Sequence, residues 1–535
     1  MKKLLTFLVI ISLFFVIGMF SCKKQGIKDV ISSNDSKSYM SKKKSKMDSS
    51  GVELSYSVND EMTNSQEFNT EEYDKVQENN FKDVITNPVS TFSIDVDTAS
   101  YSNVRRFLNN NSMPPIDAVR IEELVNYFDY DYPLPKDENP FSVNLEMSKC
   151  PWNKDRNLLM IGLKGKELQQ TEIPPSNLVF LLDVSGSMED PNKLPLLKAG
   201  YKILVSKLRP VDRVAIVVYA GAAGLILDST SGEKKNDINK AIENLRAGGS
   251  TAGGEGLQLA YQVAKKGFIP GGNNRIILAT DGDFNIGPSS DAEMVRLIEE
   301  KRKEGIFITI LGFGMGNYKD SKMEKIADAG NGNYYYIDNI LEAKKVLSND
   351  IWGTLFTIAK DVKIQIEFNP ANVKGYRLIG YENRILNKED FNDDKKDAGE
   401  IGAGHRVTAF YEIIPASSKE EIPGSDKLEY QKTTVVESED LMTLKLRYKK
   451  PDEDKSNLMS YKVIEKDIFK DNISQNFNFG ASVVEFGLLL RNSEHKGNAS
   501  YDNVLERAKK SKGKDDFGYR EEFIKLVEIA KLLKK

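Results

Sequence analysis

The stretch that decides the fold is residues 178–187, which read Leu-Val-Phe-Leu-Leu-Asp-Val-Ser-Gly-Ser. Five apolar residues in a row are typical of a strand that is buried on both faces of a sheet. A polar turn follows at once, and a helical pattern then runs over about 193–208 until Pro210 ends it. A second continuous apolar run occupies 214–219. This order of strand, turn, helix and strand is typical of an α/β domain.

The same alternation continues along residues 176–360. Further apolar runs lie at 225–227, 275–279, 306–311 and 334–337, and helical patterns lie at 236–245, 256–266, 292–304, 319–329 and from 341 onward. Strands that alternate with helices need a mostly parallel sheet whose two faces are covered by helices. We therefore expect a doubly wound, Rossmann-like α/β fold, in which ligands bind beyond the carboxyl ends of the strands.

Polar side chains gather at that expected edge. Asp183, Ser185 and Ser187 follow the first strand, Thr251 lies in the glycine-rich loop 248–254, and Asp281 follows the strand that ends at residue 279. Carboxylate and hydroxyl oxygens without imidazole or thiolate are the ligands that hard cations such as Mg²⁺ prefer. The two carboxylates balance a divalent charge, and the neutral hydroxyls leave the ion able to accept one more anionic oxygen from outside. The alternative is that Asp and Ser only cap helices and turns, and we favour the metal site.

Taken together, these five residues resemble the metal-ion-dependent adhesion site of von Willebrand factor type A domains. The resemblance implies that Ser185, Ser187 and Thr251 bind Mg²⁺ directly or nearly so. It further implies that Asp183 and Asp281 either coordinate the ion or lie just behind its ligands, and that Mn²⁺ or Ca²⁺ are alternative cations.

Two other patterns are interpreted without a ligand. The sequence Gly312-x-Gly314-x-Gly316 lacks the spacing of a dinucleotide-binding loop and is interpreted as a flexible turn. Asp95 and Asp97 alternate on an expected strand; a second cation is one interpretation, and a solvated strand face is the one we favour.

The segments 91–101, 118–128 and 485–491 resemble modules of a bacterial subgroup of the same family, and the resemblance extends from about residue 88 to the end of the chain. We expect an N-terminal associated module at 88–135, strands at 136–175, the type A domain at 176–360, and a β-rich and then helical module at 361–535. Strand patterns on both sides of the type A domain suggest one β-sandwich into which that domain is inserted. The alternative is two separate β units.

The N-terminal sequence predicts a targeting signal. Lys2 and Lys3 precede an apolar run at 4–20, and Cys22 follows in a context that looks like a bacterial lipobox. We expect a signal peptide at 1–21, lipidation of Cys22, and a disordered tether at 22–87 that is rich in Ser, Lys, Asn and acidic residues. A membrane-spanning anchor and plain secretion are the alternatives. The lipoprotein would lie in the cell envelope, on the outer membrane or facing the periplasm.

Composition excludes several function classes. The 535 residues carry 75 Lys plus Arg against 79 Asp plus Glu, a net charge of −4, which argues against nucleic acid as a partner. Loss of residues 1–21 removes two lysines, which leaves 73 basic against 79 acidic side chains. Two His and two Cys exclude a zinc cluster, a Cys-ligated iron–sulfur centre and a disulfide framework. Any bound metal must therefore use mainly oxygen ligands.

The sequence favours a binding module over an enzyme. No Walker A motif and no nucleophile–base pair accompany the expected metal site, so neither a nucleotide nor a catalytic reaction is expected. The leading hypothesis is a membrane-anchored module that captures an exposed Asp or Glu of a protein partner through Mg²⁺. A metal-assisted hydrolase and an accessory subunit of an envelope complex are the alternatives.

Overall fold

The computed structural model describes residues 71–534, except for 170–171, 251–252, 283, 285–290, 317–318, 397, 424–433 and 452. The expected signal peptide, Cys22 and most of the expected tether lie outside the described residues. In the part of the chain that is described, no helix combines the length and the apolar character that crossing a membrane requires.

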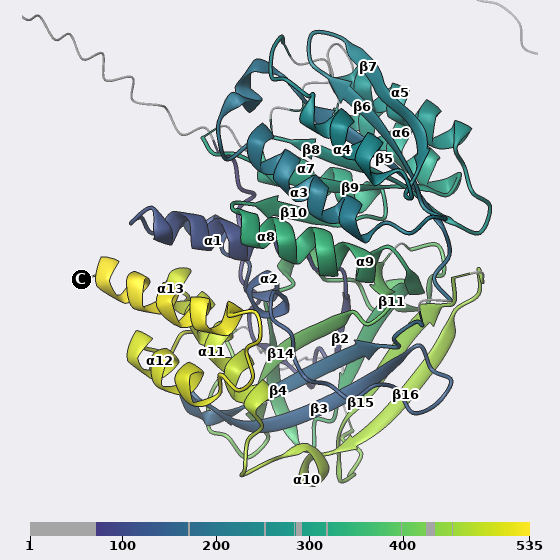
Figure 1. Ribbon diagram of the computed structural model, residues 1–535. Coiled ribbons are helices and arrows are strands. Elements are labelled where there is room, and N and C mark those ends of the chain that lie inside the picture. The colour runs from purple at the N-terminus through teal and green to yellow at the C-terminus, as the bar shows by residue number, and fades with distance from the viewer. Residues whose placement is uncertain are drawn as a thin grey trace, which may run out of the picture. The chain divides into compact units, whose positions relative to one another are not determined.

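The central domain is a six-stranded sheet with the order β10-β9-β8-β5-β6-β7 (Figure 1). Its strands are β5 (Ser176–Asp183), β6 (Arg213–Tyr219), β7 (Ala223–Ser231), β8 (Asn273–Thr280), β9 (Ile306–Phe313) and β10 (Tyr334–Ile337). All neighbours pair in parallel except β7, which lies antiparallel to β6 at one edge. The predicted mostly parallel α/β sheet is therefore confirmed.

Helices cover both faces of this sheet. They are α3 (Leu194–Lys207), α4 (Lys235–Glu243), α5 (Gly253–Lys266), α6 (Asp291–Lys303), α7 (Asp320–Ala329), α8 (Ile340–Lys345) and α9 (Ile351–Thr354). Along β5, Leu178, Phe180 and Leu182 pack into the core with α3, α4 and α8. The alternate residues Val179 and Leu181 pack into the core with α5, α6 and α7. The apolar run is continuous because β5 is buried from both sides, as its sequence predicts.

A β-sandwich flanks the central domain. One sheet has the order β1-β12-β14-β4-β3, and the other has the order β13-β11-β15-β16 with β2 paired to β11. The first contains β1 (Lys82–Asp83), β3 (Phe141–Cys150), β4 (Asn153–Gly165), β12 (Val373–Ile379) and β14 (Arg406–Pro415). The second contains β2 (Val89–Ser93), β11 (Thr357–Phe368), β13 (Gly399–Gly402), β15 (Asp440–Lys449) and β16 (Asn457–Ile464).

The central domain interrupts this sandwich between β4 and β11. Strand β4 precedes the domain and pairs antiparallel with β14, which follows it. Apolar side chains of both sheets share one core, in which Leu159 and Ile161 of β4 join Ile364 and Ile366 of β11. Strands from both sides of the inserted domain thus form a single sandwich.

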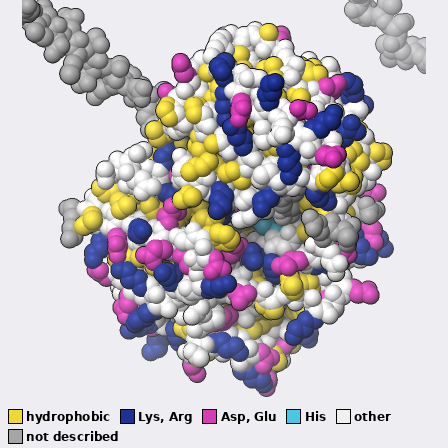
Figure 2. Space-filling model, in the orientation of Figure 1, with side chains coloured by type: hydrophobic (Ala, Val, Ile, Leu, Met, Phe, Trp, Pro, Cys, Tyr) yellow, Lys and Arg dark blue, Asp and Glu magenta, His cyan; other side chains and the backbone are white. Residues whose placement is uncertain are grey.

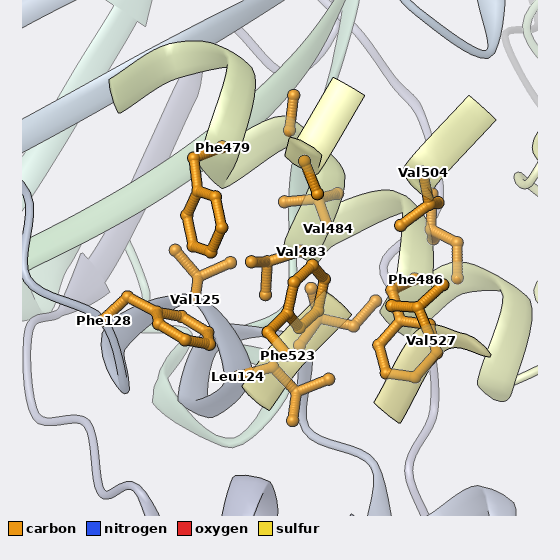
Figure 3. Packing of buried hydrophobic residues seen from close by; sticks show 14 of the residues in the cluster. Leu124, Val125, Phe128, Phe479, Val483, Val484, Phe486, Val504, Phe523 and Val527 are labelled. Carbon is orange, nitrogen blue, oxygen red and sulfur yellow. The ribbon is translucent and has the colours of Figure 1, made fainter. Parts of the chain in front are cut away.

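The N-terminal and C-terminal helices form a third core. The N-terminal helices are α1 (Ala99–Asn109) and α2 (Ile121–Asn126), and the C-terminal ones are α11 (Gln475–Leu490), α12 (Tyr501–Lys510) and α13 (Tyr519–Leu533), with the short α10 (Glu465–Ile468) before them. Figure 3 shows side chains from α2, α11 and α13 pointing toward one another. At their centre Phe523 is fully buried, with ring centroids of Phe128, Phe479 and Phe486 at 5.6, 5.5 and 5.4 Å.

A buried arginine links these helices to the central domain. Arg105 of α1 forms ion pairs with Asp338 at 2.5 Å and with Glu342 at 2.8 Å, both beside or on α8. It also pairs with Glu522 of α13 at 3.0 Å, and its own side chain is 2% exposed. A buried guanidinium destabilises the folded state unless its carboxylate partners are in place. Arg105 therefore fixes the relative positions of α1, α8 and α13.

Two expectations about the N-terminal region are wrong within the described residues. Residues 71–87 are not a free tether, because they contact the folded domains. The side chain of Glu71 is buried against Arg106, and Asn79 donates to the backbone carbonyls of residues 378 and 380. Strand β1 in this segment pairs with β12. Asp95 and Asp97 do not form a solvated strand face. Asp97 is 3% exposed, accepts a hydrogen bond from the N–H of residue 334, and both carboxylates lie within 4 Å of the guanidinium of Arg384.

Truncation of the central ring of the helical core tests the third core. We expect Phe523→Ala to lower the free energy of unfolding by about 3–5 kcal/mol, because it removes a fully buried ring that three others surround. Leu532→Ala on the same helix is the control, because Leu532 is 66% exposed and its loss should cost little. Chemical denaturation followed by circular dichroism measures both. Equal losses in the two variants would contradict this packing.

Candidate metal site at the carboxyl edge of the sheet

The first part of the site is the turn that follows β5. Asp183 ends the strand with its side chain fully buried, and the backbone N–H of Ser185 donates to Asp183 Oδ1 at 2.8 Å. The hydroxyl oxygens of Ser185 and Ser187 lie 3.0 Å apart, with Ser185 buried and Ser187 exposed. Met188 of the short 3₁₀ turn Gly186–Glu189 is also fully buried and anchors this turn in the apolar core. The turn therefore presents one carboxylate and two hydroxyls at the strand end.

The glycine-rich loop is hydrogen-bonded to this turn. The N–H of Gly186 donates to the carbonyl of Gly249 at 3.0 Å, and the N–H of Gly248 donates to the carbonyl of Val184 at 2.8 Å. Gly249 adopts φ +85°, a left-handed conformation that glycine tolerates. Thr251, the predicted ligand in this loop, lies outside the described residues. The described part of the loop nevertheless runs beside the first three predicted ligands.

The second carboxylate comes from the neighbouring strand. Strand β5 pairs in parallel with β8, with Leu182 opposite Ala279, so Asp281 follows β8 at the edge where Asp183 ends β5. Asp281 is 6% exposed and accepts a hydrogen bond from the ammonium of Lys193 at 3.0 Å. The structure thus brings Asp183, Ser185, Ser187 and Asp281 to one edge of the sheet.

The chemistry of these residues fits a hard divalent cation. Asp183 Oδ2 is buried and accepts no hydrogen bond of standard geometry among the described residues, although the hydroxyl of Tyr219 interacts with this carboxylate. Burial raises the pKa of Asp183 to about 6; the hydrogen bonds from Ser185 oppose this rise, and the nearby charge of Asp281 adds to it. A buried carboxylate with a free oxygen is costly unless a cation or a proton compensates its charge.

Hydroxyl groups have to take part in any such site. Within the described ranges, no group of three or more His, Cys, Asp or Glu side chains is placed to hold a metal ion. A cation bound at this edge would therefore be held by the carboxylates of Asp183 and Asp281 together with the hydroxyls of Ser185 and Ser187. This mixture of charged and neutral oxygens is the set that the sequence predicts.

Sequence reasoning missed Lys193, and it predicted a turn at 312–316 without the contacts that this turn makes. Lys193 immediately precedes α3, and its stem passes over Gly314, which has φ +80°. Gly316, with φ +93°, donates its N–H to the carboxylate of Glu71 at 3.0 Å. The turn thus makes specific contacts on two sides. The sequence signal for Lys193 was its position just beyond the Asp-x-Ser-x-Ser turn, at the start of the next helix.

Comparison with known proteins identifies the family. The family model described as von Willebrand factor type A domain matches residues 177–349, and a model described as von Willebrand factor matches 67–160. A third model, described as the C-terminal part of the uncharacterized protein YfbK, matches 353–533. The chain is 45% identical over 472 residues to the uncharacterized protein YfbK of Escherichia coli strain K12, across 86% of this chain and 81% of that protein. The chain belongs to the YfbK family.

Other similarities of this YfbK-family chain are more partial. It is 32% identical over 185 residues to the uncharacterized protein sll0103 of Synechocystis, which is 35% of this chain and 43% of that protein. Among solved structures it is similar to a von Willebrand factor type A protein from Catenulispora acidiphila, with 15% identity and a TM-score of 0.41, over 75% of this chain and 91% of that one. It is also similar to BatB from Bacteroides thetaiotaomicron, with 23% identity and a TM-score of 0.29, over 34% of this chain and 98% of that one.

Replacement of the buried carboxylate tests the metal site. At pH 8 the metal-free protein keeps Asp183 ionised in a buried position that has raised its pKa to about 6, which is a cost to the folded state. We therefore expect Asp183→Asn in EDTA to melt at the same temperature as the wild type or higher. We also expect Mg²⁺ to raise the melting temperature of the wild type and not that of Asp183→Asn.

The matched control is Asp228→Asn in the same domain. Asp228 is 57% exposed and pairs with Lys266 on the surface. Its replacement should therefore leave the increase in melting temperature with Mg²⁺ unchanged. Differential scanning fluorimetry measures all three proteins. A rise that persists in Asp183→Asn would contradict the site.

Proposed function

We propose that this protein is a membrane-anchored, non-enzymatic module that captures a carboxylate of a protein partner through Mg²⁺. The main support is the buried carboxylate of Asp183, whose Oδ2 accepts no hydrogen bond of standard geometry among the described residues. It lies beside two hydroxyls and a second carboxylate. Thr251 is proposed as a further hydroxyl ligand on the strength of the sequence. A bound Mg²⁺ would supply a localised positive charge with room for one more oxygen ligand.

The protein's own residues define how such a ligand would be received. Ser187 is exposed, whereas Asp183 is fully buried and Asp281 is 6% exposed. A partner therefore reaches the site from the hydroxyl side, with the carboxylates behind. An acidic side chain suits this arrangement, since its oxygen compensates positive charge that the neutral hydroxyls do not.

The distribution of surface charge also supports capture at one point. On the face shown in Figure 2, Lys and Arg side chains are interspersed with Asp and Glu side chains rather than gathered by sign. The whole chain has a net charge of −4. Long-range attraction of an acidic partner by a broad basic surface is therefore not favoured, and recognition falls to a local cation.

Anchoring rests on the N-terminal sequence. We propose that residues 1–21 are removed as a signal peptide and that Cys22 carries lipid, which places the protein in the cell envelope. Two His residues, at 405 and 495, are the only ones in the chain and lie outside the central domain, so they offer the metal site no general base. This distribution supports a binding role over hydrolysis.

A capture experiment with chemically blocked carboxyl groups tests this function. Immobilised protein beginning at residue 23 should retain envelope proteins in Mg²⁺ and release them in EDTA. Amidation of the Asp and Glu carboxyl groups in the extract should abolish retention, because it removes the oxygen anion that the bound cation requires.

The variant for this experiment is Ser185→Ala combined with Ser187→Ala, which removes both hydroxyl ligands and should reduce retention at least tenfold. The control is Ser206→Ala on α3, where the hydroxyl donates to the carbonyl of Ile203 in its own helix. Retention that survives both EDTA and the double substitution would refute capture through a metal.

A further inference from the structure

A fixed positive charge lies inside the candidate metal site. The ammonium of Lys193 is 3.0 Å from Asp281 Oδ2, and the two side chains are only 11% and 5% exposed. A second ion pair of Lys193 is with Asp190, whose carboxylate lies 3.9 Å away and is 68% exposed. The closer partner of Lys193 is therefore the buried carboxylate of the site rather than the surface group.

The backbone around Lys193 holds this contact in place. The N–H of Lys193 donates to the carbonyl of Asp190 at 3.0 Å, and its own carbonyl accepts from Leu197 in the first turn of α3 at 2.8 Å. Both ends of the residue are thus tied to the segment that links the Asp-x-Ser-x-Ser turn to α3. These two hydrogen bonds fix the backbone position from which the Lys193 side chain extends into the site.

Gly314 is shaped to accept the lysine stem. A Cβ at this position would lie 2.4 Å from Cε of Lys193, 3.0 Å from Cγ and 3.1 Å from Cδ. Gly314 also has φ +80°, which side chains of L residues rarely adopt. The glycine therefore lets the turn after β9 close over the aliphatic part of Lys193, and the stem is enclosed rather than free in solvent.

The consequence lies in the charge of the site. Asp183 and Asp281 together carry −2, and Lys193 brings the sum to −1. A divalent cation added to the two carboxylates alone would make a neutral site, whereas with Lys193 it leaves one positive charge uncompensated. Charges this close and this buried interact strongly because little water screens them.

We propose that Lys193 is a specificity-determining residue of this metal site. It weakens cation binding by neutralising Asp281, and it leaves the loaded site with a net positive charge that an anionic carboxylate of the partner compensates. A neutral oxygen, such as that of Asn or Gln, would not compensate it. This inference rests on the proposed function and adds to it a reason why the ligand must be charged.

Two substitutions separate the charge of Lys193 from its packing. Lys193→Met keeps an unbranched apolar stem over Gly314 and removes the charge, and Lys193→Arg retains the charge. Lys202→Met on the following helix, α3, is the control, since Lys202 is 42% exposed and pairs with Glu243 on the surface. Titration with Mn²⁺, followed by electron paramagnetic resonance of the free ion, gives cation affinity directly and without any partner.

We expect Lys193→Met to bind Mn²⁺ about tenfold or more tightly than the wild type, and Lys193→Arg and Lys202→Met to bind it as the wild type does. In the capture experiment, Lys193→Met loaded with Mn²⁺ should retain less of the carboxylate-bearing protein, and Lys193→Arg should restore retention.

Each outcome of the titration is decisive. Equal affinity of the wild type and Lys193→Met for Mn²⁺ would overturn the role of Lys193 and leave the proposed metal site standing. Absence of binding in every variant would overturn both. Binding in Lys193→Met alone would support the role of Lys193 and show that the wild-type site does not hold the cation unaided.

Discussion

The parallel pairing of β5 with β8 is the constraint on which the candidate site depends. Parallel strands send their carboxyl ends to the same edge of a sheet, so residues about a hundred positions apart in sequence end beside each other. Each strand is buried along its whole length, which fixes its register against both layers of helices. The position of Asp183 relative to Asp281 is therefore set by the core, and the loops only add the hydroxyls.

Besides strand pairing and apolar cores, buried charges join distant segments of the described chain. Arg105 joins α1, the region of α8 and α13 through three carboxylates. Arg384 lies between carboxylates of the N-terminal segment and those of α7. Both guanidiniums are largely buried, so the charges that meet there have to be satisfied by one another. The flanking modules are thus tied to the central domain by specific pairs as well as by apolar packing.

Much of this was predictable because it depends on local pattern. The apolar run 178–182 predicts a strand that is buried on both faces. Strands of this kind that alternate with helices predict the parallel sheet, and therefore the edge where Asp183, Ser185, Ser187 and Asp281 meet. Contacts that join distant segments were not predictable. Asp95 and Asp97 have the alternation of a solvated strand, and nothing near them in sequence reveals that Arg384 lies opposite. Lys193 looks like an ordinary residue before a helix until the turn at Gly314 is folded over it.

The insertion of the central domain between β4 and β11 separates the strands of the sandwich widely along the chain. The pairing of β4 with β14 joins residues that are far apart in the chain, since Met160 pairs with Phe410 some 250 residues later. The central domain, by contrast, occupies one continuous stretch of the chain, and all pairings of its sheet are made within that stretch. Once it has folded, it brings the end of β4 close to the start of β11, and most of the entropy of closing that long loop has already been spent. The domain with the candidate site therefore also holds together the two chain segments that form the surrounding sandwich.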